Sequence, residues 1–186
     1  RDMQLGYSSY YPLIALVTLF YFFCHYDKFN RTAFIILTSF FIYYIIFIFL
    51  PVTGPQYYYL AAGLDNIAQG IFPNVHDYFA THDQPLPMPG YSDGYFYQCV
   101  ASAHATGERP TAAFPSSHVG ITTILMILAW RSRSRPLFWG ITPLYILMCL
   151  ATVYIQAHYV VDVIGGWVSA VVIYAVLQFL YGKICA

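Results

Sequence analysis

Two short stretches of this chain contain the side chains best suited to chemistry. The first is Pro115-Ser116-Ser117-His118, and the second runs from His158 to Asp162. Proline suits the first turn of a helix and serine is a good N-cap, so we expect a helix to start near His118. Such a helix N-terminus presents free backbone N–H groups, hydroxyls and an imidazole together. This combination predicts a site for phosphate or another oxyanion.

Asp162 is the only carboxylate in an otherwise apolar run, residues 160–181. A buried charge of this kind is costly unless it is paired or faces water, which makes Asp162 a functional candidate. On a helix, His158 and Asp162 at positions i and i+4 share one face. A carboxylate bonded to one imidazole nitrogen raises the basicity of the other. The alternative is that Asp162 caps the helix start and that His158 is an interfacial histidine.

Arg109 adds a cation shortly before the first stretch. A guanidinium and helix N–H groups suit a phosphate dianion. Two histidines suit covalent phosphoryl transfer, in which one attacks phosphorus and the other protonates the leaving oxygen. Taken singly, Arg109 fits a membrane-surface arginine and His118 an incidental residue of a helix start. Their combination with His158 and Asp162 favours catalysis.

The elements that position these residues are predicted to be membrane helices. The chain has 186 residues, of which 59% are hydrophobic and only 9% charged, against about 25% charged in soluble domains. A mean hydropathy of +0.58 agrees with an integral membrane protein. The net charge is zero, which gives no reason to expect a nucleic-acid partner. The four cysteines are scattered, without the spacing of a disulfide framework or a zinc site.

The apolar runs predict an all-α, polytopic transmembrane bundle that forms one domain over residues 1–186. Spans are expected at residues 10–26, 32–52, 119–130, 137–155 and 160–181. If each run spans once, six basic residues fall on one side, which the positive-inside rule makes cytoplasmic: Lys28, Arg31, Arg131, Arg133, Arg135 and Lys183. The loop of residues 53–117 then lies on the non-cytoplasmic face, periplasmic or lumenal, as a cap that carries part of the active site. Short helices are expected in it near residues 60–69, 75–80 and 94–105.

The same loop contains two His-Asp pairs that raise the question of a metal site. His76-Asp77 and His82-Asp83 contain metal-ligating side chains. Their separation places them on different faces of a helix, and their surroundings are rich in proline. Solvated loop residues are the favoured interpretation, and we expect no metal and no other cofactor.

The motifs resemble those of the type 2 phosphatidic acid phosphatase superfamily. Its patterns run Lys-x6-Arg-Pro, then Pro-Ser-Gly-His, then Ser-Arg-x5-His-x3-Asp. The matching pieces here are Arg109-Pro110, Pro115-Ser116-Ser117-His118 and His158-x-x-x-Asp162. The superfamily consists of metal-independent lipid phosphatases and phosphotransferases, usually with six spans. The resemblance therefore implies five spans in this chain and a sixth upstream of Arg1.

The resemblance also implies a role for each residue. His158 would be the nucleophile that forms a phosphohistidine, and Asp162 would orient and activate it. His118 would protonate the leaving alcohol and then act as base for the attacking water. Arg109 and Ser116, with the backbone around Ser117, would hold the phosphate oxygens.

Three positions depart from the family pattern. Ser102 stands where the pattern has Lys, Ser117 where it has Gly, and Thr152 where it has Arg. The His-Tyr-x-x-Asp-Val sequence and the stretch of residues 50–58 are similar to the inositol phosphorylceramide and sphingomyelin synthase branch. That stretch would contribute to a lipid-access rim; its simpler interpretation is a helix ended by Pro and Gly with interfacial tyrosines.

The sequence therefore predicts a membrane enzyme that hydrolyses the phosphate ester of a lipid. The runner-up is transfer of the phospho-headgroup to a second lipid alcohol, which uses the same residues. A non-catalytic transporter with a relay of His158 and Asp162, and an inactive homologue, are the remaining alternatives. The expected partners are a lipid phosphate and the bilayer, while the lipid and the oligomeric state are not assigned.

Overall fold

A computed structural model describes residues 2–90, 92–107 and 109–184 of the chain. This part is helical, and its extended pairing is limited to one isolated parallel bridge between Val52 and Ala112. The helices are α1 (Asp2–Ser8), α2 (Tyr10–Cys24), α3 (Tyr26–Phe49), α4 (Pro55–Ala62), α5 (Leu64–Ala68), η1 (Tyr78–Ala80), α6 (Tyr95–Gly107), α7 (Ser117–Arg131), α8 (Arg135–Tyr154) and α9 (Val160–Ile184). The all-α expectation is confirmed.

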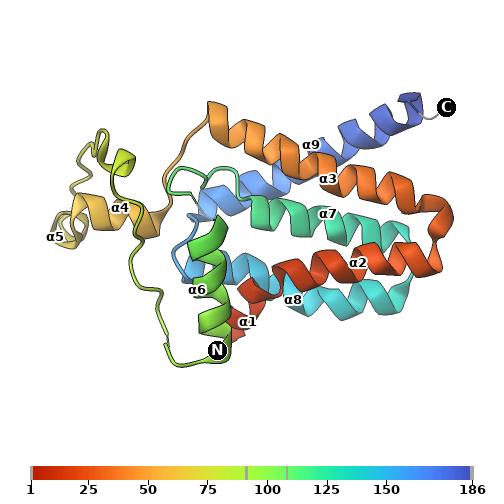
Figure 1. Cartoon of the computed structure of the whole chain (residues 1–186), viewed down its shortest axis with the longest axis horizontal. Coiled ribbons are helices and arrows are strands. Elements are labelled where there is room, and N and C mark those ends of the chain that lie inside the picture. Colours follow the sequence, from red (N-terminus) through yellow and green to blue (C-terminus); the bar gives the residue numbers. More distant parts are fainter. Residues whose placement is uncertain (1, 91, 108, 185–186) are drawn as a thin grey trace.

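Five long helices, α2, α3, α7, α8 and α9, form a bundle along the longest axis of the molecule (Figure 1). Helix α7 is the central one, since it packs against all four others. Its sequence is apolar on every side, and many of its side chains are buried, among them Val119, Ile121, Ile124, Leu125 and Leu128. A helix that is apolar all round is stable when its whole circumference is covered. Helix α7 therefore forms the core that holds the bundle together.

The described residues contain three or four candidate membrane spans. Helices α3, α8 and α9 are long and apolar enough to cross a membrane, and α1 with α2 gives a fourth candidate, bent by 48°. Helix α7 has 15 residues, and at about 1.5 Å per residue it is shorter than a hydrocarbon core of about 30 Å. The described residues therefore support three or four spans, which agrees with a membrane protein, and the five-span count is not confirmed.

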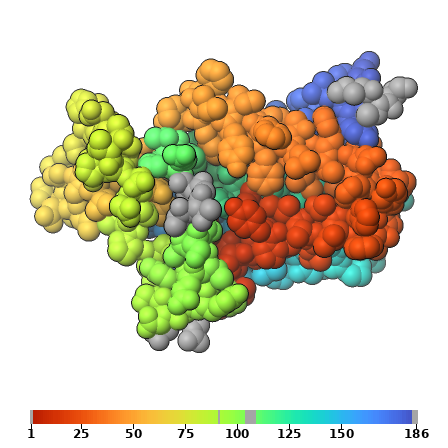
Figure 2. All heavy atoms as spheres, viewed as in Figure 1, coloured from red at the N-terminus to blue at the C-terminus, as the bar shows by residue number. Residues whose placement is uncertain are grey.

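Residues 53–117 extend from one end of the bundle. The short helices expected there are present, although the first is split into α4 and α5 at Gly63, which has a positive φ of 84°. Helix α6 packs on α1, while α4, α5 and the following loop protrude as a lobe (Figure 2). The α2–α3 turn, the α7–α8 turn and the end of α9 lie at the opposite end (Figure 1). The lobe and the basic turns are thus separated by the length of the bundle.

Glycines allow the close helix approaches that position the site. A Cβ on Gly166 of α9 would lie 2.8 Å from the carbonyl oxygen of Ser116 and 3.1 Å from Cβ of Val119. A Cβ on Gly120 of α7 would collide with the hydroxyl of Tyr43. That hydroxyl reaches between the helices and lies 2.8 Å from Oγ of Ser169 on α9. Helices α3, α7 and α9 are therefore joined at one point close to the start of α7.

Candidate active site

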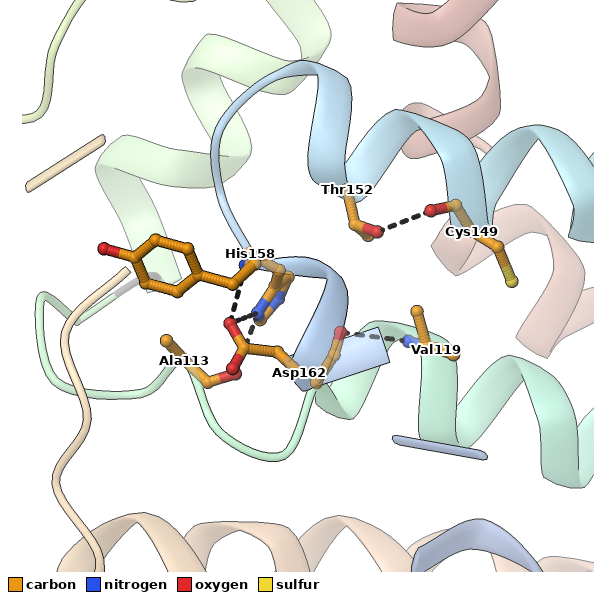
Figure 3. Close-up of polar contacts among 8 residues, drawn as sticks. Ala113, Val119, Cys149, Thr152, His158 and Asp162 are labelled. Atoms are coloured by element: carbon orange, nitrogen blue, oxygen red, sulfur yellow. Dashed lines mark hydrogen bonds and ion pairs between the residues drawn. The ribbon is translucent and has the colours of Figure 1, made fainter. Parts of the chain in front are cut away.

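His158 lies in the turn between α8 and α9, where its backbone and side chain are both fixed. Its backbone N–H donates to the carbonyl of Thr152 at 3.0 Å, and its Nδ1 lies 2.8 Å from the carbonyl oxygen of Ala113 (Figure 3). A carbonyl oxygen only accepts hydrogen bonds, so Nδ1 must carry the proton. The lone pair of the neutral ring is then on Nε2. His158 is 5% exposed and is held in the tautomer that a nitrogen nucleophile requires.

The segment that follows α3 holds the Ala113 carbonyl, which accepts the hydrogen bond from His158, in place. The N–H of Ala113 donates to the carbonyl of Val52 at 2.9 Å, and the N–H of Val52 donates to the carbonyl of Thr111 at 3.2 Å. Gly54 lies so close to the next turn that a Cβ would be 2.5 Å from the carbonyl oxygen of Ala157. Residues 52–54 thus connect the two chemical stretches that are far apart in the sequence.

Asp162 forms the cap of α9 and also lies beside His158. Its Oδ2 accepts the backbone N–H of Tyr159 at 2.7 Å and is 3.7 Å from Nδ1 of His158. Because α9 begins at Val160, the prediction that His158 and Asp162 share one helix face is wrong. A residue at the third helical position that bonds back to the N-cap N–H is the second half of a capping box. The carboxylate is 1% exposed, so its charge acts on His158 at short range, while Ala113 makes the direct hydrogen bond.

His118 stands in the first turn of α7 and contacts two tyrosine rings. Its ring centroid is 4.7 Å from that of Tyr7 in α1 and 4.4 Å from that of Tyr10 in α2. The centroids of the His118 and His158 rings are 6.0 Å apart, with an angle of 61° between the ring planes. The two imidazoles therefore lie close together, as the sequence predicts, one from the first turn of α7 and the other from the turn between α8 and α9.

Both histidines line a cavity of about 630 Å³ at this end of the bundle. Ser117 and Arg109 also line it, together with Gln56 of the segment after α3. Much of the remaining lining is an aromatic wall that consists of Tyr7, Tyr10, Tyr11, Phe40, Tyr43, Tyr44, Phe47 and Tyr57. Sequence reasoning missed this wall, because among 19 tyrosines and 15 phenylalanines no spacing sets these apart from aromatics that face lipid.

The two serines of the first stretch have different surroundings. Ser116 is fully buried and caps α7, with its Oγ accepting the N–H of Val119 at 3.4 Å. Its own N–H donates to the backbone carbonyl of Asp162 at 3.0 Å, and it is absent from the lining of the cavity. Ser117 and Arg109 do line the cavity, and Arg109 is exposed. The prediction that a serine caps this helix is confirmed for Ser116. Its buried position outside the cavity gives no support to the predicted contact with phosphate.

Comparison with known families agrees with the motifs. A sequence model of the PAP2 superfamily matches residues 3–176. The chain belongs to the PAP2 superfamily. Membership indicates an enzyme of the phosphatase or phosphotransferase type, and it does not distinguish the synthase-like branch. Neither the comparison with curated proteins nor that with solved structures found a match.

The structure shows what occupies two positions where this member departs from the PAP2 pattern. Thr152 is fully buried, and its hydroxyl donates to the carbonyl of Cys149 at 2.9 Å (Figure 3). It therefore supports His158 through its backbone carbonyl and adds no charge. Ser102 is exposed on α6. Among the described residues that line the cavity, Arg109 is the single Lys or Arg.

Tyr159 lies next to His158, at the start of α9. Burial, and then the nearby Tyr59 and Asp162, raise the pKa of Tyr159 to about 12, so this phenol stays neutral at physiological pH.

The loop histidines show no metal-binding arrangement among the described residues. The ring of His82 stacks on that of Tyr78 with 4.2 Å between centroids. Within residues 2–90, 92–107 and 109–184, no group of three His, Cys, Asp or Glu side chains is arranged to hold a metal ion.

Proposed function

We propose that this PAP2 superfamily protein is a lipid phosphatase that acts through a phosphohistidine on His158. One observation carries the proposal: the bond from Nδ1 of His158 to the carbonyl of Ala113 at 2.8 Å. It leaves the lone pair of Nε2 as the reactive site, beside the His118 ring at a centroid distance of 6.0 Å. An activated nucleophile next to a second proton-transferring group is the arrangement that covalent catalysis requires.

In the first step, Nε2 of His158 forms a bond to phosphorus and the bond from phosphorus to the leaving alcohol oxygen breaks. His118 gives its proton to that oxygen. The imidazole ring of His158 becomes positively charged, and the Asp162 carboxylate, with Oδ2 3.7 Å from Nδ1, stabilises this charge. In the second step, His118 takes a proton from water, the oxygen of that water binds phosphorus, and the bond from phosphorus to Nε2 breaks.

The phosphate oxygens are held by neutral donors and one cation in this proposal. Arg109 and the Ser117 hydroxyl come from the cavity lining, and the first backbone N–H groups of α7 add to them. Ser116 keeps these N–H groups in place by capping the helix. We therefore assign Ser116 a supporting role in place of the phosphate contact that the family pattern implies.

The cavity suits a substrate with a long apolar part. Its lining includes Tyr11, Tyr44 and Ile48, whose side chains are 63%, 59% and 74% exposed on the outside of the bundle. These residues belong to α2 and α3, which are membrane-type helices. The cavity thus extends from the histidines to the surface that faces acyl chains, so a lipid tail can stay in the bilayer. Lys28, Arg131 and the other basic residues at the opposite end support a non-cytoplasmic site.

Transfer of a phospho-headgroup to an acceptor lipid is the second candidate, and the charge of the cavity favours it. The described lining offers one guanidinium, that of Arg109. One cation balances a phosphodiester, which carries a single negative charge, better than it balances a phosphomonoester dianion. In this version a lipid hydroxyl takes the place of water in the second step, and the roles of His118 and His158 are unchanged.

The test uses the purified chain in mixed micelles with phosphatidic acid, phosphatidylglycerophosphate, phosphatidylinositol phosphate, undecaprenyl diphosphate, lipid A and ceramide phosphates. Release of inorganic phosphate in water alone supports hydrolysis, while product that requires an added lipid alcohol supports transfer. The His158→Ala variant should lose all turnover and should no longer retain label from a phosphate-labelled substrate after acid-free denaturation. A fully active His158→Ala protein would refute the phosphohistidine. No phosphate release and no transfer on the whole panel would favour the non-catalytic transporter or the inactive homologue.

A further inference from the structure

A second cavity lies at the other end of the bundle, between the last turn of α7 and the first turns of α8. Its volume is about 900 Å³. We call it the basic groove, and its lining consists of Ala129, Trp130, Arg131, Arg133, Ser134, Arg135, Phe138 and Trp139. It shares no lining residue with the cavity of the two histidines. A ligand in the basic groove would therefore be separate from the proposed reaction.

The turn that forms the groove is held by its serines. Oγ of Ser132 donates to the carbonyl of Ala129 at 2.7 Å and accepts the N–H of Ser134 at 3.2 Å. Oγ of Ser134 then accepts the N–H of Leu137 at 3.4 Å and caps α8. Between the two serines, Arg133 has a φ of 60°, a conformation that costs a residue with a side chain of order 1 kcal/mol and that glycine adopts freely. The turn thus presents its arginines from a defined backbone.

The positive charge of this turn is not balanced within the described chain. Arg131, Arg133 and Arg135 are all exposed, and within the described residues no ion pair joins any of them to a carboxylate. The N-terminus of α8 starts at Arg135 and adds the partial positive charge of its backbone dipole. Guanidinium groups hold phosphate through paired hydrogen bonds. The chemistry of this side of the groove therefore favours a phosphate group.

The other side of the groove is aromatic. Trp130 and Trp139 are 67% and 65% exposed. The Phe138 ring lies between them, with centroid distances of 5.1 Å to Trp130 and 5.3 Å to Trp139. Tryptophan is enriched at the level of lipid headgroups, and an exposed aromatic surface of this size offers little to a small hydrated anion. Basic and aromatic side chains thus meet in one groove at this end of the bundle.

We propose that the basic groove binds the headgroup of an anionic phospholipid. The phosphate lies among the guanidinium groups of Arg131, Arg133 and Arg135, and the glycerol backbone and first acyl carbons lie along the Trp130, Phe138 and Trp139 rings. Clusters of basic residues next to membrane helices attract anionic lipids of the cytoplasmic leaflet. The bound lipid links α7 to α8 and so makes the stability of the bundle depend on membrane composition.

The experiment measures lipid binding to the full chain in nanodiscs of phosphatidylcholine doped with phosphatidylglycerol, by native mass spectrometry and by the thermal unfolding midpoint. Arg133→Gly is the informative variant, because it removes a guanidinium at a position whose backbone suits glycine. We expect about fivefold weaker phosphatidylglycerol binding, the equivalent of about 1 kcal/mol. Its unfolding midpoint in pure phosphatidylcholine should stay the same or rise. Lys183→Gln is the matched control, since it removes a positive charge at the same end outside the groove.

The possible results separate the explanations. Weaker phosphatidylglycerol binding by Arg133→Gly, with unchanged binding by Lys183→Gln, supports the proposed lipid site in the basic groove. Equal losses in both variants would mean general surface attraction and would overturn the proposal. Full displacement of the lipid by inorganic phosphate would also overturn it, since the groove would then be a site for soluble anions. Equal binding of phosphatidylcholine and phosphatidylglycerol would overturn the proposal as well, because the arginines would then not select an anionic headgroup.

Discussion

The substitution Asp162→Asn separates the two roles that the structure gives to this carboxylate. An asparagine side chain keeps an oxygen that can accept the Tyr159 N–H, which Oδ2 of Asp162 accepts at 2.7 Å. It removes the negative charge that lies 3.7 Å from Nδ1 of His158. The change therefore leaves the helix cap in place and alters only the electrostatics at the proposed nucleophile.

The size of the effect follows from Coulomb's law. With an effective dielectric constant of about 20, two unit charges at 3.7 Å interact by roughly 4–5 kcal/mol. This interaction is strongest once the His158 ring is positively charged, so it stabilises the phosphohistidine and the transition state that leads to it. Each 1.36 kcal/mol is about tenfold in rate. We therefore expect kcat of Asp162→Asn to fall about a thousandfold, with a small change in KM.

The assay is release of phosphate, or transfer to an acceptor lipid, on the best substrate of the panel, with the unfolding midpoint measured on the same samples. Asp162→Ala is the control, since it also removes the cap and should cost about 0.5–2 kcal/mol of stability. Asparagine should keep a midpoint close to that of the unmodified chain. A near-normal rate in Asp162→Asn would refute the electrostatic reasoning and leave Asp162 as a helix cap. An unfolded Asp162→Asn protein would show that the charge itself is required for folding.

Three further outcomes are expected. EDTA should leave turnover unchanged, because the proposed proton and phosphoryl transfers use only imidazoles; inhibition that added zinc or magnesium reverses would contradict this. Gly166→Ala should lower the free energy of unfolding by about 1–3 kcal/mol, since its Cβ would lie 2.8 Å from the Ser116 carbonyl oxygen. Gly140→Ala is the control and should not lower it, because a Cβ there would have nothing within 4 Å. Equal midpoints of the two variants in chemical denaturation would count against the close packing of α9. Tyr10→Leu should lower kcat by about 2- to 30-fold, since an aromatic ring over the protonated His118 stabilises it by about 0.5–2 kcal/mol. Tyr10→Phe keeps the ring and should lower kcat only slightly. A kcat of Tyr10→Leu close to that of the unmodified chain would refute a role for the ring contact.

Much of the fold could be predicted from local sequence. The long helices follow from apolar runs, and the short helices of residues 53–117 follow from breaks at glycine and proline, such as Gly63. The five-span count is not confirmed, because helix α7 has 15 residues, fewer than the ~17–25 that a spanning helix needs. Its neighbours also cover it, with Ile121 and Ile124 fully buried.

Local sequence was enough to predict three features of the candidate site: a helix capped by Ser116, an imidazole at its first turn, and a histidine followed by Asp162. These features depend on neighbouring residues and on side-chain types. Two other features follow from the packing of distant segments: the hydrogen bond from His158 to the Ala113 carbonyl and the two tyrosine rings against His118. Such contacts join residues that are distant along the chain. They arise because the 52–54 segment pairs with residues 111–113 and because glycine lets α9 approach α7.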